Sequence, residues 1–147
     1  MLNLSIFAER LSWLMFEKQL SSVELTSILG CGHTTINRYL KGNRLPKTDL
    51  VVRLADYFCC TTDYLLGVDE ESYPNTFHSC PPFHEHFKSV LDNHKMSAQK
   101  LHELTQIPLS AIYYWLSGDY LPTIDKIVSI AEKLNCSVDY LLGRTNS

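Results

Sequence analysis

Basic side chains are concentrated between residues 33 and 47 of the chain. Arg38, Lys41, Arg44 and Lys47 fall in this stretch, which contains no acidic residue. Such a local concentration of positive charge is the electrostatic feature that phosphate binding needs. The whole chain, in contrast, has 13 basic and 16 acidic residues and a net charge of −3. A nucleic-acid hypothesis therefore depends on this stretch alone, and an ordinary solvated basic face is the alternative interpretation.

A second group of side chains, between residues 78 and 86, is of the types that bind metal ions. It consists of histidines and a cysteine, namely His78, Cys80, His84 and His86. Zinc binds these residue types, but their spacing matches no zinc finger, and the last two would lie on different sides of a helix start. We therefore expect no metal site. The sequence shows no nucleophile motif, phosphate-binding loop or carboxylate pair, so we expect no cofactor and no enzyme activity.

The cysteine pattern and the hydropathy indicate a cellular compartment. The five cysteines include no CxxC pair, and a disulfide framework is not expected without a secretory context. We expect Cys31, Cys60 and Cys136 to be small core residues. No apolar run is long enough to cross a membrane, and the segment MLNLSIFAER has no signal-peptide pattern. These features predict a cytoplasmic protein.

One unit of sequence occurs twice. Residues 7–67 align with residues 83–143 without a gap, and a repeat of this kind predicts repeated architecture. The identical pairs include Phe7/Phe83, Ser21/Ser97, Leu25/Leu101, Ile36/Ile112, Gly42/Gly118, Asp49/Asp125 and the closing DYLLG at 63–67 and 139–143.

Apolar spacing within each copy predicts short helices and no strands. Phe7, Leu11 and Leu14 share one helical face, and their counterparts are Phe83, Phe87 and Val90. Residues 21–24, Ser-Ser-Val-Glu, form a capping-box signature for a second helix that ends near Leu29.

A glycine-containing turn at residues 30–32 separates the second helix from a third, which Gly42 is expected to end. A fourth helix follows, and Thr61 or Thr62 begins a short fifth. The side chains expected to face the core of the third and fourth helices are Ile36, Tyr39, Leu40, Val51, Leu54, Ala55 and Phe58.

These elements predict an all-α protein with two tandem five-helix domains. The domains cover residues 1–68 and 83–147, and residues 69–82 form a linker that contains three consecutive acidic residues and three prolines. This composition favours an extended, solvated spacer.

The helix order resembles that of the lambda-repressor/Cro-like (XRE) helix-turn-helix family. The segments that carry the resemblance are LSSVELTSILGCGHTTINRYLKGNRLP, LVVRLADYF and TTDYLLG, and in the second copy MSAQKLHELTQIPLSAIYYWLSGDYLP, IVSIAEKLN and SVDYLLG. The resemblance covers most of the chain. It implies double-stranded operator DNA as the ligand and transcription control as the role.

The resemblance also implies which residues meet DNA. In this family the third helix lies in the major groove, which places His33, Thr34 and Arg38 toward the bases and Asn37 beside them. Lys41, Arg44 and Lys47 follow where the chain passes the DNA backbone. Ser21 and Ser22 begin the second helix, whose free backbone N–H groups can also hold a phosphate, although helix capping alone explains these serines nearly as well.

The second copy lacks this polar and basic surface. Residues 109–123 contain no basic residue and one acid, Asp119. Aromatic and apolar side chains replace the expected DNA contacts, namely Leu109, Tyr113, Tyr114 and Tyr120. Such residues on an outer face often mark a protein contact, and we expect them to join two chains into a homodimer. Packing on the linker or the first copy is an alternative, and so is weak DNA contact through Lys95 and Lys100.

The sequence supports two hypotheses for the function, and they belong to different classes. The first is a sequence-specific DNA-binding transcriptional regulator, expected to be a repressor. The second is an antitoxin or another protein-interaction module that binds a partner protein through the second domain. A neighbouring toxin gene would favour the antitoxin, and neighbouring phage genes would favour the repressor.

Overall fold

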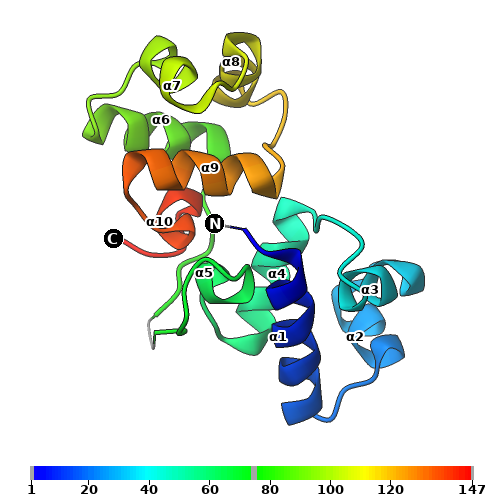
Figure 1. Ribbon diagram of the computed structural model, residues 1–147. Helices are drawn as coiled ribbons and strands as arrows, with labels where there is room; N and C mark the ends of the chain where they lie inside the picture. Colours follow the sequence, from blue (N-terminus) through cyan, green and yellow to red (C-terminus); the bar gives the residue numbers. More distant parts are fainter. Residues whose placement is uncertain (1, 74–75, 147) are drawn as a thin grey trace. The chain divides into compact units, whose positions relative to one another are not determined.

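The structure, a computed structural model, describes residues 2–73 and 76–146, except for the side chain of His33. Throughout these residues the regular structure is helical, with no strand (Figure 1). The expected all-α class is confirmed. The chain divides into two compact units, Met1–Pro74 and Asn75–Ser147, which are called unit 1 and unit 2 below.

Each unit consists of five helices that pack in the same way. Unit 1 contains α1 (Leu4–Glu17), α2 (Ser22–Leu29), α3 (His33–Leu40), α4 (Thr48–Phe58) and α5 (Thr62–Leu65). Unit 2 contains α6 (Phe83–Asn93), α7 (Ala98–Thr105), α8 (Leu109–Ser117), α9 (Ile124–Leu134) and α10 (Val138–Leu142). In both units the first helix packs on the third and fifth, the second on the third and fourth, and the fourth on the fifth.

The second helix of unit 1 begins with the expected capping box. The Ser21 hydroxyl accepts a hydrogen bond from the Glu24 N–H at 3.1 Å, and the Ser21 N–H donates to the Glu24 carboxylate at 3.2 Å. These bonds satisfy N–H groups that a helix start leaves without partners. The helix ends at Leu29, as predicted, because Gly30 adopts a left-handed conformation with φ of 66°.

Aromatic and aliphatic side chains form the core of unit 1. Phe7 and Leu11 of α1 are fully buried, and the Phe7 ring meets the Tyr39 ring edge to face at a centroid distance of 5.7 Å. Leu14 is only half-buried, and Met15 takes the inner position in the last turn of α1. The four residues predicted for α4 are all buried, namely Val51, Leu54, Ala55 and Phe58.

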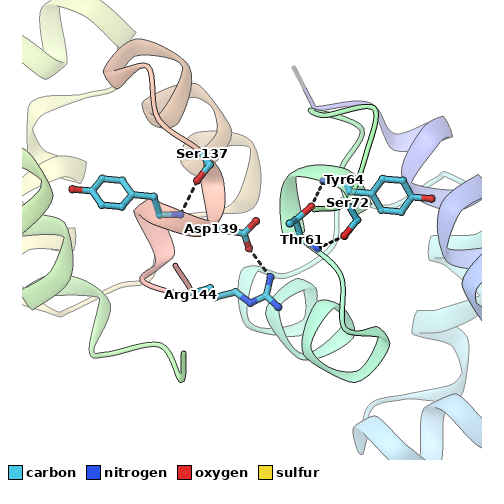
Figure 2. Close-up of polar contacts among 7 residues, drawn as sticks. Thr61, Tyr64, Ser72, Ser137, Asp139 and Arg144 are labelled. Carbon is cyan, nitrogen blue, oxygen red and sulfur yellow. Dashed lines mark hydrogen bonds and ion pairs between the residues drawn. The ribbon is translucent and has the colours of Figure 1, made fainter. Parts of the chain in front are cut away.

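The short last helices of the two units begin with matching hydroxyl caps (Figure 2). The Thr61 hydroxyl accepts from the Tyr64 N–H at 3.1 Å, and the Ser137 hydroxyl accepts from the Tyr140 N–H at 3.0 Å. The Thr61 N–H in turn donates to the Ser72 hydroxyl at 3.0 Å. Thr61 therefore caps α5, whose first helical residue is Thr62.

The segment between α5 and α6 is not a simple solvated spacer in the part that the structure describes. Ser72 is held against the start of α5 by its bond to Thr61. On the other side, the His78 N–H donates to the Arg144 carbonyl at 2.8 Å, and the Phe77 ring lies 4.1 Å from the Arg144 guanidinium carbon. The composition of the linker does not reveal these attachments, because each depends on a residue far away in the sequence.

The cysteines occupy less uniform positions than expected. Cys60 is buried, as expected, and its neighbour Cys59 is exposed. Cys31 and Cys136 are half-buried rather than core residues, because both lie in loops at the surface of their units. The described residues include no group of three or more His, Cys, Asp or Glu side chains placed to hold a metal ion. In the same part of the chain, no helix is long and apolar enough to cross a membrane.

Candidate nucleic-acid interface

The turn between α2 and α3 fixes the direction of α3. Gly30 ends α2 in a left-handed conformation, and the extended residue Gly32 begins α3. Ile36 and Tyr39 then anchor one side of α3 in the core, where both are fully buried. Burial of these two side chains leaves the opposite side of α3 toward solvent.

The solvent side of α3 carries the residues expected to read DNA. Thr34 and Arg38 are exposed, and Asn37 is half-buried. Lys41, which follows the last helical residue, is exposed as well. The side chain of His33 lies outside the described residues. The positions 34, 38 and 41 recur at helical spacing, so one face of α3 presents a hydroxyl, a guanidinium and an ammonium group.

The loop between α3 and α4, together with α4, places further cations near the start of α3. Arg44, Lys47 and Arg53 line a hollow of about 220 Å³ together with Gly32 and Thr35. The hollow also includes one carboxylate, Asp49. Three cations and the start of a helix favour an anion at this place, because the helix dipole is positive at its N-terminus.

The hydroxyl of Tyr39 supports this loop from the core side. It accepts a hydrogen bond from the Lys47 N–H at 3.3 Å. Burial raises the pKa of the Tyr39 hydroxyl above its ordinary value of 10.0, because desolvation disfavours the phenolate. The bond from Lys47 and the charge of Arg44 lower this pKa, but they only partly offset the effect of burial. Tyr39 is therefore a neutral hydrogen-bonding group at physiological pH.

The start of α2 offers less to an anion than α3 does. The Ser21 hydroxyl and N–H are both engaged with Glu24. Ser22, the first residue of α2, is half-buried. The carboxylate of Glu24 lies within this first turn and opposes the approach of a phosphate. Capping accounts for Ser21, and Ser22 remains part of the candidate interface.

The corresponding face of unit 2 is aromatic. Tyr113, Tyr114 and Tyr120 are 56%, 48% and 63% exposed, and Leu121 is 48% exposed. The rings of Tyr114 and Tyr120 meet edge to face at 5.2 Å. These four residues are called the tyrosine patch below. Leu109, expected to belong to the same surface, is half-buried at the first turn of α8.

The comparison with known protein families matches unit 2. Residues 87–141 match a family model described as Helix-turn-helix. Over these residues unit 2 is similar to a helix-turn-helix domain. The match begins within α6 and ends within α10, so it includes all or part of each helix of that unit. Comparison with curated proteins and with solved structures finds no match. The helix-turn-helix match thus falls on the unit whose α8 face has no cation at the matching positions, while unit 1 carries the basic face on the same order of helices.

Arg53 and Leu121 are two surface residues that the sequence analysis did not select. Arg53 lies on α4, the helix that follows the basic stretch. It donates through Nη2 to the Leu29 carbonyl at the end of α2. Its counterpart in the alignment is Ser129, so Arg53 follows the same pattern of charge loss as the other cations. A search of the whole alignment for such pairs would have found it. Leu121 matches Leu45 in the alignment, so the repeat alone gives no sign that Leu121 is exposed whereas Leu45 is half-buried.

Proposed function

We propose that the chain is a sequence-specific DNA-binding transcriptional regulator that acts as a repressor, and that unit 1 reads the DNA. The observation that carries the proposal is the contrast between matching faces of the two units. The cations around α3 are Arg38, Lys41, Arg44, Lys47 and Arg53, and their counterparts are Tyr114, Ser117, Tyr120, Thr123 and Ser129. Because the helices pack in the same way, the fold itself does not require these five charges.

The residues of α3 and of the loop after it divide into a base-reading and a phosphate-binding group. Arg38 is exposed on α3, and a guanidinium there can donate to guanine O6 and N7 together. Asn37, His33 and Thr34 supply further polar groups to the same groove. Lys41, Arg44 and Lys47 neutralise phosphates, which fixes the position of the unit on the duplex without reading its sequence.

The proposal is tested by grafting the unit 2 residues onto unit 1 in the full chain. Duplexes bound by the wild-type protein are first selected from random sequences. The variant Arg38→Tyr/Lys41→Ser/Arg44→Tyr should then lose binding to the selected duplex, and its residual binding should depend less steeply on salt, because fewer counterions are released.

The matched control removes charge from unit 2. Lys95→Ala/Lys100→Ala, on exposed positions, should retain wild-type affinity for the selected duplex. Loss of binding in the control, with binding intact in the grafted variant, would place the DNA-binding surface in unit 2 and contradict the proposal.

Two copies of the chain would present two reading helices. In helix-turn-helix proteins, two readers on half-sites about 34–36 Å apart bind together. Unit 2 lacks the polar side chains of a second reader, whereas its tyrosine patch offers a self-complementary surface for a two-fold interface. The proposed active species is therefore a homodimer joined through Tyr113, Tyr114 and Tyr120.

The exposed tyrosine patch also favours a second candidate function, binding of a different protein, as an antitoxin does with its toxin. The two candidates differ in the state of the isolated chain. A homodimer formed by the pure protein through the tyrosine patch supports the first, and a patch that remains accessible at all concentrations supports the second.

A further inference from the structure

The hollow between α3 and α4 of unit 1 has the size and charge of a site for a small anion. Its volume of about 220 Å³ lies below the roughly 300–1,000 Å³ of sites for drug-sized ligands. Three cations, Arg44, Lys47 and Arg53, line it together with one acid, Asp49, so the lining carries an excess of positive charge. Among the described residues, no carboxylate forms an ion pair with any of the three cations. Their charges are therefore available to a ligand.

The hydroxyl of Tyr39 is a buried hydrogen-bond donor at this hollow. Tyr39 is fully buried, and its hydroxyl accepts from the Lys47 N–H. A phenol also donates one hydrogen bond, yet no described residue accepts one from Tyr39. The charges that act on this hydroxyl come from Arg44 and Asp49, which both line the hollow. A buried donor without an acceptor costs free energy, and an anion in the hollow would supply the acceptor.

Unit 2 has the same helix packing around the matching place but none of the three cations. The residues that match Thr35, Tyr39, Arg44, Lys47 and Arg53 are Ala111, Trp115, Tyr120, Thr123 and Ser129. The acid keeps its type, because Asp125 matches Asp49. Since the helices of both units pack in the same way, packing does not require the cations of the hollow.

The charge of the hollow favours a dianion. A phosphate monoester carries about −1.5 to −2 charges at neutral pH, whereas each phosphodiester group of DNA carries a single charge. Arg53 is held in place by the bond from its Nη2 to the Leu29 carbonyl. Its Nε and Nη1 remain for parallel hydrogen bonds to phosphate oxygens, a geometry that the planar guanidinium favours.

The hollow lies beside the exposed face of α3 and not on it. Thr35 and Tyr39, which line the hollow, lie about 100° around the helix from Thr34 and Arg38. A ligand in the hollow therefore leaves the side chains assigned to the bases uncovered. It does engage Arg44 and Lys47, the two loop cations that were assigned to DNA phosphates.

We propose that the hollow binds the phosphate group of a small phosphorylated molecule through Arg44, Lys47 and Arg53, and that this ligand lowers the affinity of unit 1 for DNA. The ligand and the duplex compete for Arg44 and Lys47. The regulatory step rests on the proposed function of unit 1, whereas binding of the phosphate group does not.

Inorganic phosphate alone tests the binding step on the full chain without DNA. At about pH 8 it is largely a dianion, and phosphorus NMR at constant ionic strength reports its binding. We expect a dissociation constant in the millimolar range, because the ligand has so few atoms. Dimethyl phosphate, a monoanion like the DNA backbone, should bind more weakly.

Two variants of the lining should change phosphate binding in opposite directions. Asp49→Asn should tighten it about fivefold, because a like charge is removed from the hollow. Arg53→Ser, which installs the residue of unit 2, should weaken it at least about tenfold. Asp125→Asn is the matched control, since it makes the same change of net charge in unit 2, and it should leave phosphate binding unchanged. Circular dichroism verifies that each variant is folded.

Three results would overturn the binding step. The first is a wild-type chain that binds no phosphate at tens of millimolar. The second is equal tightening by Asp49→Asn and Asp125→Asn, because net charge and not the hollow would then explain the effect. The third is stronger binding of dimethyl phosphate than of phosphate, which would assign the hollow to the DNA backbone.

The regulatory step is measured with the selected duplex. Phosphate should lower the affinity for the duplex more than chloride does at the same ionic strength, and this excess should shrink in Arg53→Ser. Equal effects of the two salts would overturn the regulatory step. A chain that binds phosphate but no duplex would contradict the proposed function and the regulatory step, but not the phosphate site, whose test contains no DNA.

Discussion

Arg144 and Asp139 form an ion pair inside unit 2, with Arg144 Nη1 2.5 Å from Asp139 Oδ1 (Figure 2). The two side chains are 0% and 4% exposed. The Phe77 ring covers the guanidinium, and the Arg144 carbonyl accepts from the His78 N–H. The pair therefore connects the start of α10, the chain after α10 and the segment before α6. The position of unit 1 that matches Arg144 holds Val68, which cannot form such a pair.

Removal of the arginine from this pair should destabilise unit 2 strongly. Arg144→Met leaves the Asp139 carboxylate buried without its counter-charge, which typically costs about 3–5 kcal/mol. Urea unfolding followed through the buried Trp115 measures the loss. Asn146→Ala, at an exposed position in the same segment, is the control. A loss below about 1 kcal/mol, the range of exposed pairs, would contradict the buried placement of the pair.

Replacement of Arg38 by alanine should lower affinity for the selected duplex by about 1–3 kcal/mol and relax the preference at one base pair. The physical reason is the loss of a bidentate contact to one base edge. Competition between the selected duplex and duplexes altered at single positions measures both effects.

Lys41→Ala gives the contrasting result for a phosphate contact. Affinity should fall about equally for all duplexes, and the salt dependence should become less steep. If Arg38→Ala also weakened every duplex equally, Arg38 would be a phosphate contact and the assignment of direct readout would be wrong.

The stability of unit 1 should decline at high pH through Tyr39. Burial raises the pKa of Tyr39 in the folded protein, so the folded protein retains a proton that the unfolded chain releases. The stabilisation that protonated Tyr39 contributes is fully present below pH 10. It is lost as the pH rises from 10 through the raised pKa of the folded protein.

Tyr39→Phe should make the stability of unit 1 less dependent on pH above 10. At neutral pH it should cost about 0.5–1.5 kcal/mol, because the bond from the Lys47 N–H is lost. Urea unfolding at a series of pH values compares this variant with Tyr73→Phe, a change at an exposed tyrosine. The prediction would be contradicted if the free energy of unfolding changed with pH above 10 by the same amount in the wild type and in Tyr39→Phe.

Two negative charges on the tyrosine patch should separate the proposed dimer. Tyr113→Glu/Tyr114→Glu changes two exposed residues, so the variant should fold but remain a monomer at low micromolar concentration, where the wild type should have twice the mass of one chain. Light scattering measures the mass, and affinity for the two-half-site duplex should fall as well. Tyr73→Glu is the matched control. A wild-type monomer that protects both half-sites would show that unit 2 itself reads DNA.

The sequence by itself determined the local structure of the chain. The capping box at Ser21, the glycine-containing turn after α2 and the apolar positions of α4 were all identifiable, because each depends on residues within a turn or two of one another. The basic stretch and its uncharged counterpart were also visible, since the gapless alignment places each residue beside its equivalent.

Tertiary structure decided the features that join distant parts of the chain. The Arg144–Asp139 pair and its cover by Phe77 required the segment before α6 to meet the end of α10. The placement of Arg53 near the start of α3 and of Tyr39 beside the same hollow also depends on packing. Helical periodicity specifies which side chains share a face, but the burial of a charge or the exposure of a ring is set by whichever helix packs against that face.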